Sequence, residues 1–222
     1  MDDLVARFDA PSISCLKIVF TNQPFFVVDF THLSQFIGRV KEFRSFGHAW
    51  FDLSHDTIRI TLIPQRSTPE SFSGALQWNF LCDTDRPIPT LVEACNTSLL
   101  PLSDIESYSI SAAPYINLDP QSGFNMEDLP WLKVLRQFSA AKSLSVSTHI
   151  VPPVAFALKQ VMKEEITDVL PAIQELSVSM GLRAGPDREA IERFAAARGL
   201  SVFETSNYSS KWRISARNTH EG

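Results

Sequence analysis

The sequence predicts a one-domain α/β fold, an open curved solenoid in which helices and strands alternate and the strands form a parallel sheet on the concave face. Two observations predict it. Four short segments alternate a large residue with a small one, as in a strand with one buried face: YSIS at 108–111, LSVS at 144–147, LSVS at 176–179 and LSVF at 200–203. A stretch with apolar residues at helical spacing precedes each segment. Because such a unit cannot bury its apolar sides alone, stacked units must share one core.

The N-terminal half supplies further elements of both kinds. Strands are expected at 14–20 and 75–82, and helices at 31–40 and 89–99. Between them, residues 48–62 predict two strands around a Ser54-His55-Asp56 turn. We therefore expect one β-hairpin near residues 46–63, which interrupts the helix–strand rhythm.

Three helices are expected in the C-terminal half. The first, at 128–138, has an N-capping aspartate and a proline in its first turn, and the second, at 152–162, opens with two prolines. The third follows Gly185, carries acids in its first turn and ends at Arg198-Gly199. Each of these helices leads into one of the alternating strands.

The spacing of the strands resembles that of long leucine-rich repeats. Strand centres at 16, 49, 78, 108, 144, 176 and 200 lie 24 to 36 residues apart. The alternative is a doubly wound sheet with helices on both faces, whose strands would be apolar along their whole length. The alternating serines favour the open arrangement. We expect a single domain over 1–206, followed by a tail at 207–222 that is disordered or caps the last unit.

Composition excludes several classes of partner. Twenty Lys and Arg against 25 Asp and Glu give a net charge of -5 without a basic cluster, so nucleic acid is not an expected partner. No stretch reaches the roughly 18 apolar residues of a membrane span, and none near the start resembles a signal peptide. Cys15, Cys82 and Cys95 are widely spaced in apolar surroundings and are expected to be reduced and buried. A cytoplasmic or nuclear protein follows.

No motif supports catalysis. The sequence contains no glycine-rich phosphate loop, no metalloprotease helix motif and no nucleophile-elbow motif. His48 and His55 could form a metal cluster with Asp52 or Asp56, although a hairpin with solvated polar residues is the favoured interpretation. We expect no cofactor, no metal and no enzyme. The alternative of an α/β hydrolase-like or other small-molecule enzyme stays open because of the many serines and this hairpin.

Five segments carry a family resemblance: FTNQP at 20–24, LSQFIGR at 33–39, LLPLS at 99–103, VLPAIQ at 169–174 and FAAARGLS at 194–201. From about residue 13 to 201 the chain resembles the leucine-rich-repeat-like C-terminal region of F-box proteins from mushroom-forming (basidiomycete) fungi. The resemblance implies recognition of a target protein for a cullin ubiquitin ligase. In that family the F-box binds a Skp-type adaptor. About a dozen residues precede the first strand here, so we expect neither an F-box nor adaptor binding, and an F-box-less remnant without activity stays an alternative.

The predicted binding surface is the concave face of the sheet. If the large residues of each strand point into the core, the residues between them lie on the opposite face. Small hydroxyl side chains there would let a protein partner lie close to the sheet; the alternative is that they only ease sheet curvature. The expected partner-binding residues of this non-catalytic interaction module are Ser109, Ser111, Ser145, Ser147, Glu175, Ser177, Ser179, Ser201 and Phe203, with Lys17, Gln77 and Asn79 on the same side.

Overall fold

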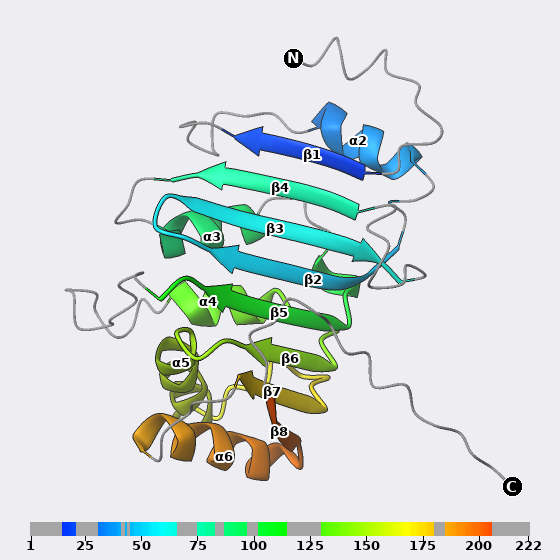
Figure 1. Cartoon of the computed structure of the whole chain (residues 1–222). Coiled ribbons are helices and arrows are strands. Elements are labelled where there is room, and N and C mark those ends of the chain that lie inside the picture. The colour runs from blue at the N-terminus through cyan, green and yellow to red at the C-terminus, as the bar shows by residue number, and fades with distance from the viewer. Residues whose placement is uncertain are drawn as a thin grey trace, which may run out of the picture.

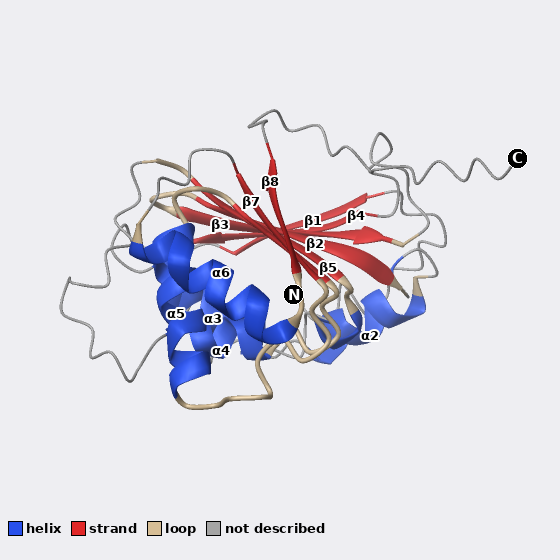
Figure 2. Ribbon diagram, turned by 90° about the horizontal axis from the view of Figure 1, so that it is seen from below, coloured by secondary structure: helices blue, strands red, loops and turns tan. Residues whose placement is uncertain are grey.

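The computed structural model describes residues 15–20, 31–40, 43, 45–65, 75–82, 87–96, 102–114, 130–179 and 185–205. These residues form one eight-stranded sheet with helices on one side (Figures 1 and 2). The strands are β1 (Cys15–Phe20), β2 (Phe46–Leu53), β3 (Thr57–Pro64), β4 (Ala75–Leu81), β5 (Ser107–Ala112), β6 (Ser143–Val146), β7 (Glu175–Ser179) and β8 (Ser201–Thr205). The helices are α2 (Thr31–Arg39), α3 (Pro87–Asn96), α4 (Pro130–Arg136), α5 (Val151–Lys163) and α6 (Pro186–Arg198), with the short 3-10 helix η3 (Leu102–Asp104).

Each of the predicted strands and helices is present, with its ends within three residues of the expected positions. The local signals explain this agreement. Helix α6, for example, begins at Pro186 and ends before Gly199, whose φ of 66° is the left-handed conformation that glycine adopts without strain. Its closing bond runs from the Leu200 N–H to the Ala195 carbonyl at 2.9 Å. The predicted tail at 207–222 lies outside the described residues.

The C-terminal strands follow one another in the sheet as the sequence predicts. The spatial order is β1-β4-β3-β2-β5-β6-β7-β8, and β2, β5, β6, β7 and β8 are all parallel neighbours. Leu144 pairs with Leu176, and Leu176 pairs with Val202. The alternating segments therefore lie side by side in register.

The N-terminal strands depart from the predicted parallel order. With strand centres at 16, 49 and 78, a regular stack would place β1 beside β2, but β1 instead pairs in parallel with β4. The hairpin itself is confirmed, and its turn folds β3 back antiparallel to β2, so that the other edge of β3 receives β4. The sheet is therefore mixed, because the antiparallel hairpin is part of it and its second strand, β3, lies between β2 and β4.

The helices α2 to α6 all lie on one side of the sheet, where the hydrophobic core forms (Figure 2). Strand alternation directs Phe51 of β2 and Tyr108 of β5 into this core, where the Tyr108 ring stacks on Phe138 with ring centroids 3.9 Å apart. The Tyr108 hydroxyl donates a hydrogen bond to the Leu102 carbonyl. None of the described helices is long and apolar enough to cross a lipid bilayer.

One expectation about the cysteines is wrong. All three are free thiols, and Cys95 on α3 is buried as predicted, but Cys82 is half-buried and Cys15 is exposed. Cys15 lies on an edge strand and faces away from the helices, since it alternates with Leu16, Ile18 and Phe20, the residues of β1 that pack against the core. Its apolar sequence neighbours predicted burial of Cys15 wrongly, because alternate residues of a strand point to opposite faces.

Candidate functional site: the open face of the sheet

The side of the sheet opposite the helices carries no described helix, and we call it the open face (Figure 2). Because side chains alternate along a strand, the pairing register sorts the open-face residues into rows across the strands. The central row runs Lys17, Gln77, Thr61, Trp50, Ser109, Ser145, Ser177 and Phe203, from one edge of the sheet to the other. The predicted placement of Lys17 and Gln77 on the same side as the serines is therefore confirmed.

Serines give the middle of the open face short, polar side chains. One row of half-buried serines, Ser109, Ser145 and Ser177, crosses β5, β6 and β7. In the next row Ser107 and Ser143 are neighbours on β5 and β6, and the Ser143 hydroxyl donates to the Ser107 hydroxyl at 2.9 Å. We call these residues the serine patch: Ser107, Ser109, Ser143, Ser145 and Ser177. Since a serine side chain is short, a partner could approach the backbone of these strands closely.

The remaining predicted residues lie around this patch, with one exception. Glu175, Ser201 and Phe203 are exposed, Phe203 at 51%, and Ser179 is paired in register with Thr205 at the end of β7. Ser147 differs, because it follows β6 and is buried, and its hydroxyl oxygen accepts the Ala112 N–H at 3.2 Å. Ser147 thus links two strands and offers no surface to a partner.

Sequence reasoning missed a shallow hollow of about 230 Å³ on the other half of the open face. The hollow lies over β1, β4, β3 and β2, and it is lined by Cys15, Trp50, Asp52, Arg59, Thr61, Ala75 and Gln77. A signal for it existed. Trp50, Asp52, Arg59 and Thr61 all alternate with the apolar residues of the hairpin, and the observed register places Asp52 opposite Arg59 and Trp50 opposite Thr61.

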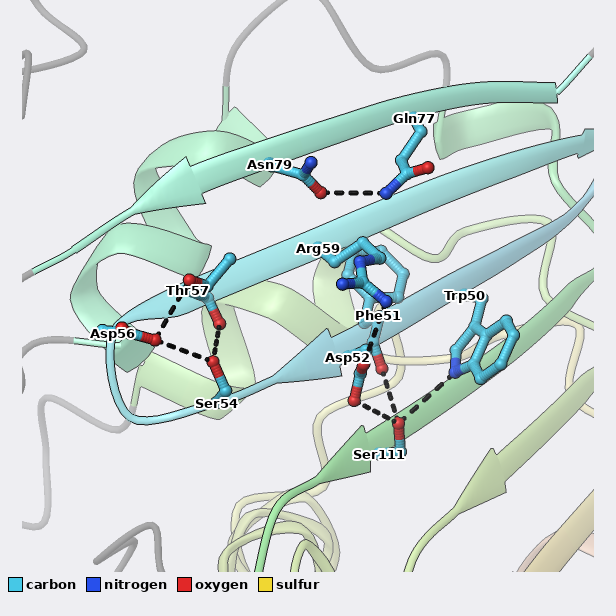
Figure 3. A network of polar contacts seen from close by, with 10 residues as sticks. All are labelled: Trp50, Phe51, Asp52, Ser54, Asp56, Thr57, Arg59, Gln77, Asn79 and Ser111. Atoms are coloured by element: carbon cyan, nitrogen blue, oxygen red, sulfur yellow. Dashed lines mark hydrogen bonds and ion pairs between the residues drawn. The ribbon is translucent and has the colours of Figure 1, made fainter. Parts of the chain in front are cut away.

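Four side chains in and beside the hollow form a polar network (Figure 3). The Trp50 Nε1–H donates to the Ser111 Oγ at 3.3 Å, and the Ser111 hydroxyl lies 3.1 Å from the Asp52 Oδ1. Arg59 faces the other carboxylate oxygen, with its Nη1 3.8 Å from the Asp52 Oδ2. Ser111, which was expected to contact a partner directly, thus holds Asp52 in place.

Charge on the open face is sparse. The strand residues that carry it are Lys17, Arg59, Asp52 and Glu175. His48, in register with Ser107 on β5, adds no charge at neutral pH, because burial lowers its pKa and the nearby Glu106 only partly opposes this effect. Arg59 lines the hollow and Lys17 lies on β1 beside it, whereas Glu175 lies at the other end of the sheet.

The hairpin turn does not have the geometry of a nucleophilic triad. The Ser54 hydroxyl donates directly to the Asp56 Oδ1 at 3.2 Å, and the His55 Nδ1 lies 3.5 Å from the same oxygen. A serine nucleophile needs an imidazole between its hydroxyl and the carboxylate. The Asp56 pKa is lowered, mainly by the Thr57 hydroxyl, so this aspartate is an ionised turn residue. Across the described ranges, no three His, Cys, Asp or Glu residues come together as metal ligands.

The chain matches no protein-family model, no curated protein and no solved structure.

Proposed function

We propose that this chain is a non-catalytic protein-interaction module that binds a target protein on its open face. The observation that carries the proposal is the one-sided construction of the sheet. Helices cover one face (Figure 2), and the other face carries the row of polar and aromatic residues that runs in register from Lys17 to Phe203. Because no described helix covers this face, it is accessible to a macromolecular partner.

The side chains on the open face suit such a partner. The serine patch provides hydroxyl groups that both donate and accept hydrogen bonds, and it lies between Trp50 on β2 and Phe203 on β8. Aromatic residues are enriched among the few that provide most of the binding energy in protein interfaces. We expect Trp50 and Phe203 to be such anchors, with the serines providing close contact between them.

We further propose that the helix–strand units form a leucine-rich-repeat-like solenoid whose concave side is the open face. The parallel run from β5 to β8, in which each strand is the neighbour of the next, supports this architecture. The resemblance of five sequence segments to fungal F-box proteins supports target recognition for a ubiquitin ligase as the biological role. The three free cysteines support a cytoplasmic or nuclear location.

The test is a selection of binding partners from a displayed protein library, followed by affinity measurement with purified proteins. Replacing both Ser145 and Ser177 by arginine puts two long charged side chains on the serine patch. We expect this double variant to weaken binding at least about 100-fold, equivalent to roughly 2.7 kcal/mol. The matched control is Ser139→Arg, at an exposed serine in the turn after α4.

The control variant should bind like the wild-type protein. If every selected partner binds the double variant as tightly as the wild type, the open face is not the interaction surface. Circular dichroism and thermal unfolding of all three proteins ensure that the comparison is made between folded proteins.

A further inference from the structure

We propose that the hollow on the open face is a specificity subsite for an extended segment of the partner protein, with Arg59 binding an acidic side chain and Trp50 an apolar one two residues away. This inference deepens the proposed function and rests on it. It assigns the chemistry of the ligand, which the serine patch alone does not.

The first argument is the unused binding capacity of Arg59. Its guanidinium has five N–H donors arranged for bidentate carboxylate binding, yet among the described residues its recorded contact is the ion pair with Asp52 at 3.8 Å. Charge-assisted N–H···O bonds are about 2.7–2.9 Å long. The side chains of Arg59 and Asp52 are 53% and 42% exposed, and exposed pairs contribute little to stability. A ligand carboxylate can therefore make a better bond to Arg59 than Asp52 does.

The second argument is that Asp52 is held by its other neighbours. Its Oδ1 is 3.1 Å from the Ser111 hydroxyl, which in turn accepts the Trp50 indole N–H. These contacts keep the carboxylate close to β5, on the far side of β2 from Arg59 (Figure 3). They also orient the Trp50 ring at the margin of the hollow. The network thus leaves the Arg59 guanidinium available to a ligand and holds the Trp50 ring in a fixed orientation.

The third argument is spacing. Trp50 pairs with Thr61, and Asp52 pairs with Arg59, so Trp50 and Arg59 are diagonal neighbours across an antiparallel pair. Diagonal positions of this kind are about 7–8 Å apart. In an extended peptide, side chains two residues apart lie on the same side at about 6.6–6.8 Å. An acidic residue, any residue and an apolar residue in succession therefore match Arg59 and Trp50.

The fourth argument is local charge. The chain as a whole carries -5, whereas the strands under the hollow carry Lys17 and Arg59 against Asp52, with the ionised Asp56 beyond them in the hairpin turn. Glu175 lies four strands from β3, a distance of about 19 Å at the usual strand spacing. Since the screening length at physiological ionic strength is about 8 Å, the Arg59 guanidinium in direct contact with a ligand affects it more than the distant Glu175 does. An acidic segment is favoured over a basic one.

The test uses nuclear magnetic resonance on the isotopically labelled full chain, with acetylated tripeptide amides as probes. Glu-Ala-Phe should shift the Trp50 indole signal and the amide signals of β2 and β3 in a saturable way. Gln-Ala-Phe and Lys-Ala-Phe, which lack the carboxylate, should bind at least about tenfold more weakly, or 1.4 kcal/mol. Glu-Ala-Ala, which lacks the ring, should also bind more weakly.

Two substitutions of opposite effect make the test sharp. Arg59→Gln should abolish the preference for the glutamate peptide over the glutamine peptide, whereas Asp52→Asn should strengthen glutamate binding because it removes the competing carboxylate. The matched control is Arg136→Gln on α4, because Arg136 is also a half-exposed arginine paired with an aspartate, at 3.3 Å from Asp168. This control should leave peptide binding unchanged.

The inference is overturned if none of the peptides gives a saturable shift, if the glutamine peptide binds as well as the glutamate peptide, or if folded Arg59→Gln keeps the preference. Its failure is distinguishable from failure of the proposed function. A selected partner that is lost on arginine substitution of Ser145 and Ser177 but binds Arg59→Gln normally would leave the interaction module standing without this subsite.

Discussion

Burial changes the acid–base chemistry of two side chains on the helix side of the sheet. Cys95 on α3 and Tyr108 on β5 are both buried, and burial raises the pKa of each because it disfavours the charged form. At Tyr108 the effect of burial is the largest, and the negative charge of Asp104 adds to it, as does that of Cys95 once the thiol ionises. Both groups are therefore neutral in the folded protein over the ordinary pH range.

A loss of stability at alkaline pH follows. The unfolded chain ionises these groups near their ordinary pKa values of 9.0 and 10.0, whereas the folded chain keeps its protons to higher pH. The free energy of unfolding is thus unaffected by these groups below about pH 9. It falls as the pH rises further, by up to roughly 1.4 kcal/mol per pH unit for each group. Urea unfolding at a series of pH values measures the slope.

The variant Cys95→Ala separates the two contributions. It should remove the part of the slope that begins near the ordinary thiol pKa of 9.0 and leave the part that Tyr108 causes. A free energy of unfolding that stays constant through this range in the wild-type protein would contradict the assigned burial of both groups.

The burial of a strand residue can be predicted from the sequence when the alternation of side chains between the two faces is taken into account. Predictions that ignore this alternation are wrong. Cys95 was expected to be buried and is buried, but Cys15 is exposed because its position in β1 faces away from the helices. The same rule, applied to the hairpin, would have identified Trp50 and Arg59 as open-face residues. Which of them come close together also depends on the hairpin register, in which Leu53 pairs with Ile58 and Asp52 with Arg59. The predicted three-residue turn would shift this register by one residue.

At the scale of single elements, two glycines differ in the space around them. Gly47 lies in β2 where the pairing register shifts between Phe46 and His48, and a Cβ there would come 3.0 Å from the Gln65 Cα. Gly38 lies in α2, and a Cβ there would meet no atom within 4 Å. Alanine should therefore have opposite effects at the two positions.

We expect Gly47→Ala to lower the free energy of unfolding by about 1–3 kcal/mol, because the backbone of β3's end must move to make room. Gly38→Ala should raise it by about 0.5–1 kcal/mol, because alanine has the better helix propensity and restricts the unfolded chain. Denaturant unfolding of both variants tests the pair. An equal change at both positions would mean that the predicted difference in local packing is absent.

Element identity was predictable because it depends on local signals, whereas strand order was not. Caps, prolines and alternation lie within a few residues of the structures that they determine, as at Gly199 after α6. The pairing of β1 with β4 joins segments about 60 residues apart, and nothing in either segment distinguishes that partner from β2. Both edges of β2 are already paired, one with β3 of the hairpin and the other with β5, so β1 pairs elsewhere.

At the scale of the whole molecule, the strands differ in how many neighbours they have. Central strands β2, β3 and β5 are paired on both sides, whereas β1 and β8 form the two edges of the described sheet. The edge strands also carry exposed apolar side chains, Val19 on β1 and Val202 and Phe203 on β8. An edge strand has a row of backbone groups without a sheet partner, and local opening there costs less.

Hydrogen exchange followed by mass spectrometry should therefore show a gradient of protection. Amides of β2, β3 and β5 should exchange most slowly, and those of β1 and β8 at least about 100-fold faster, since opening free energies within one protein range from near zero to the global value. Equal protection in all eight strands would contradict the gradient and indicate that the sheet opens only as a unit.

The alternation along β5, β6 and β7 has a consequence for how this protein can diversify. Ser109, Ser145 and Ser177 point away from the core, while Leu144 and Leu176 beside them fill it. Mutations at the first set can therefore accumulate with little loss of folding stability, and mutations at the second cannot. Single substitutions at these serines, in evolution or in a combinatorial library, could therefore change which ligand the protein binds.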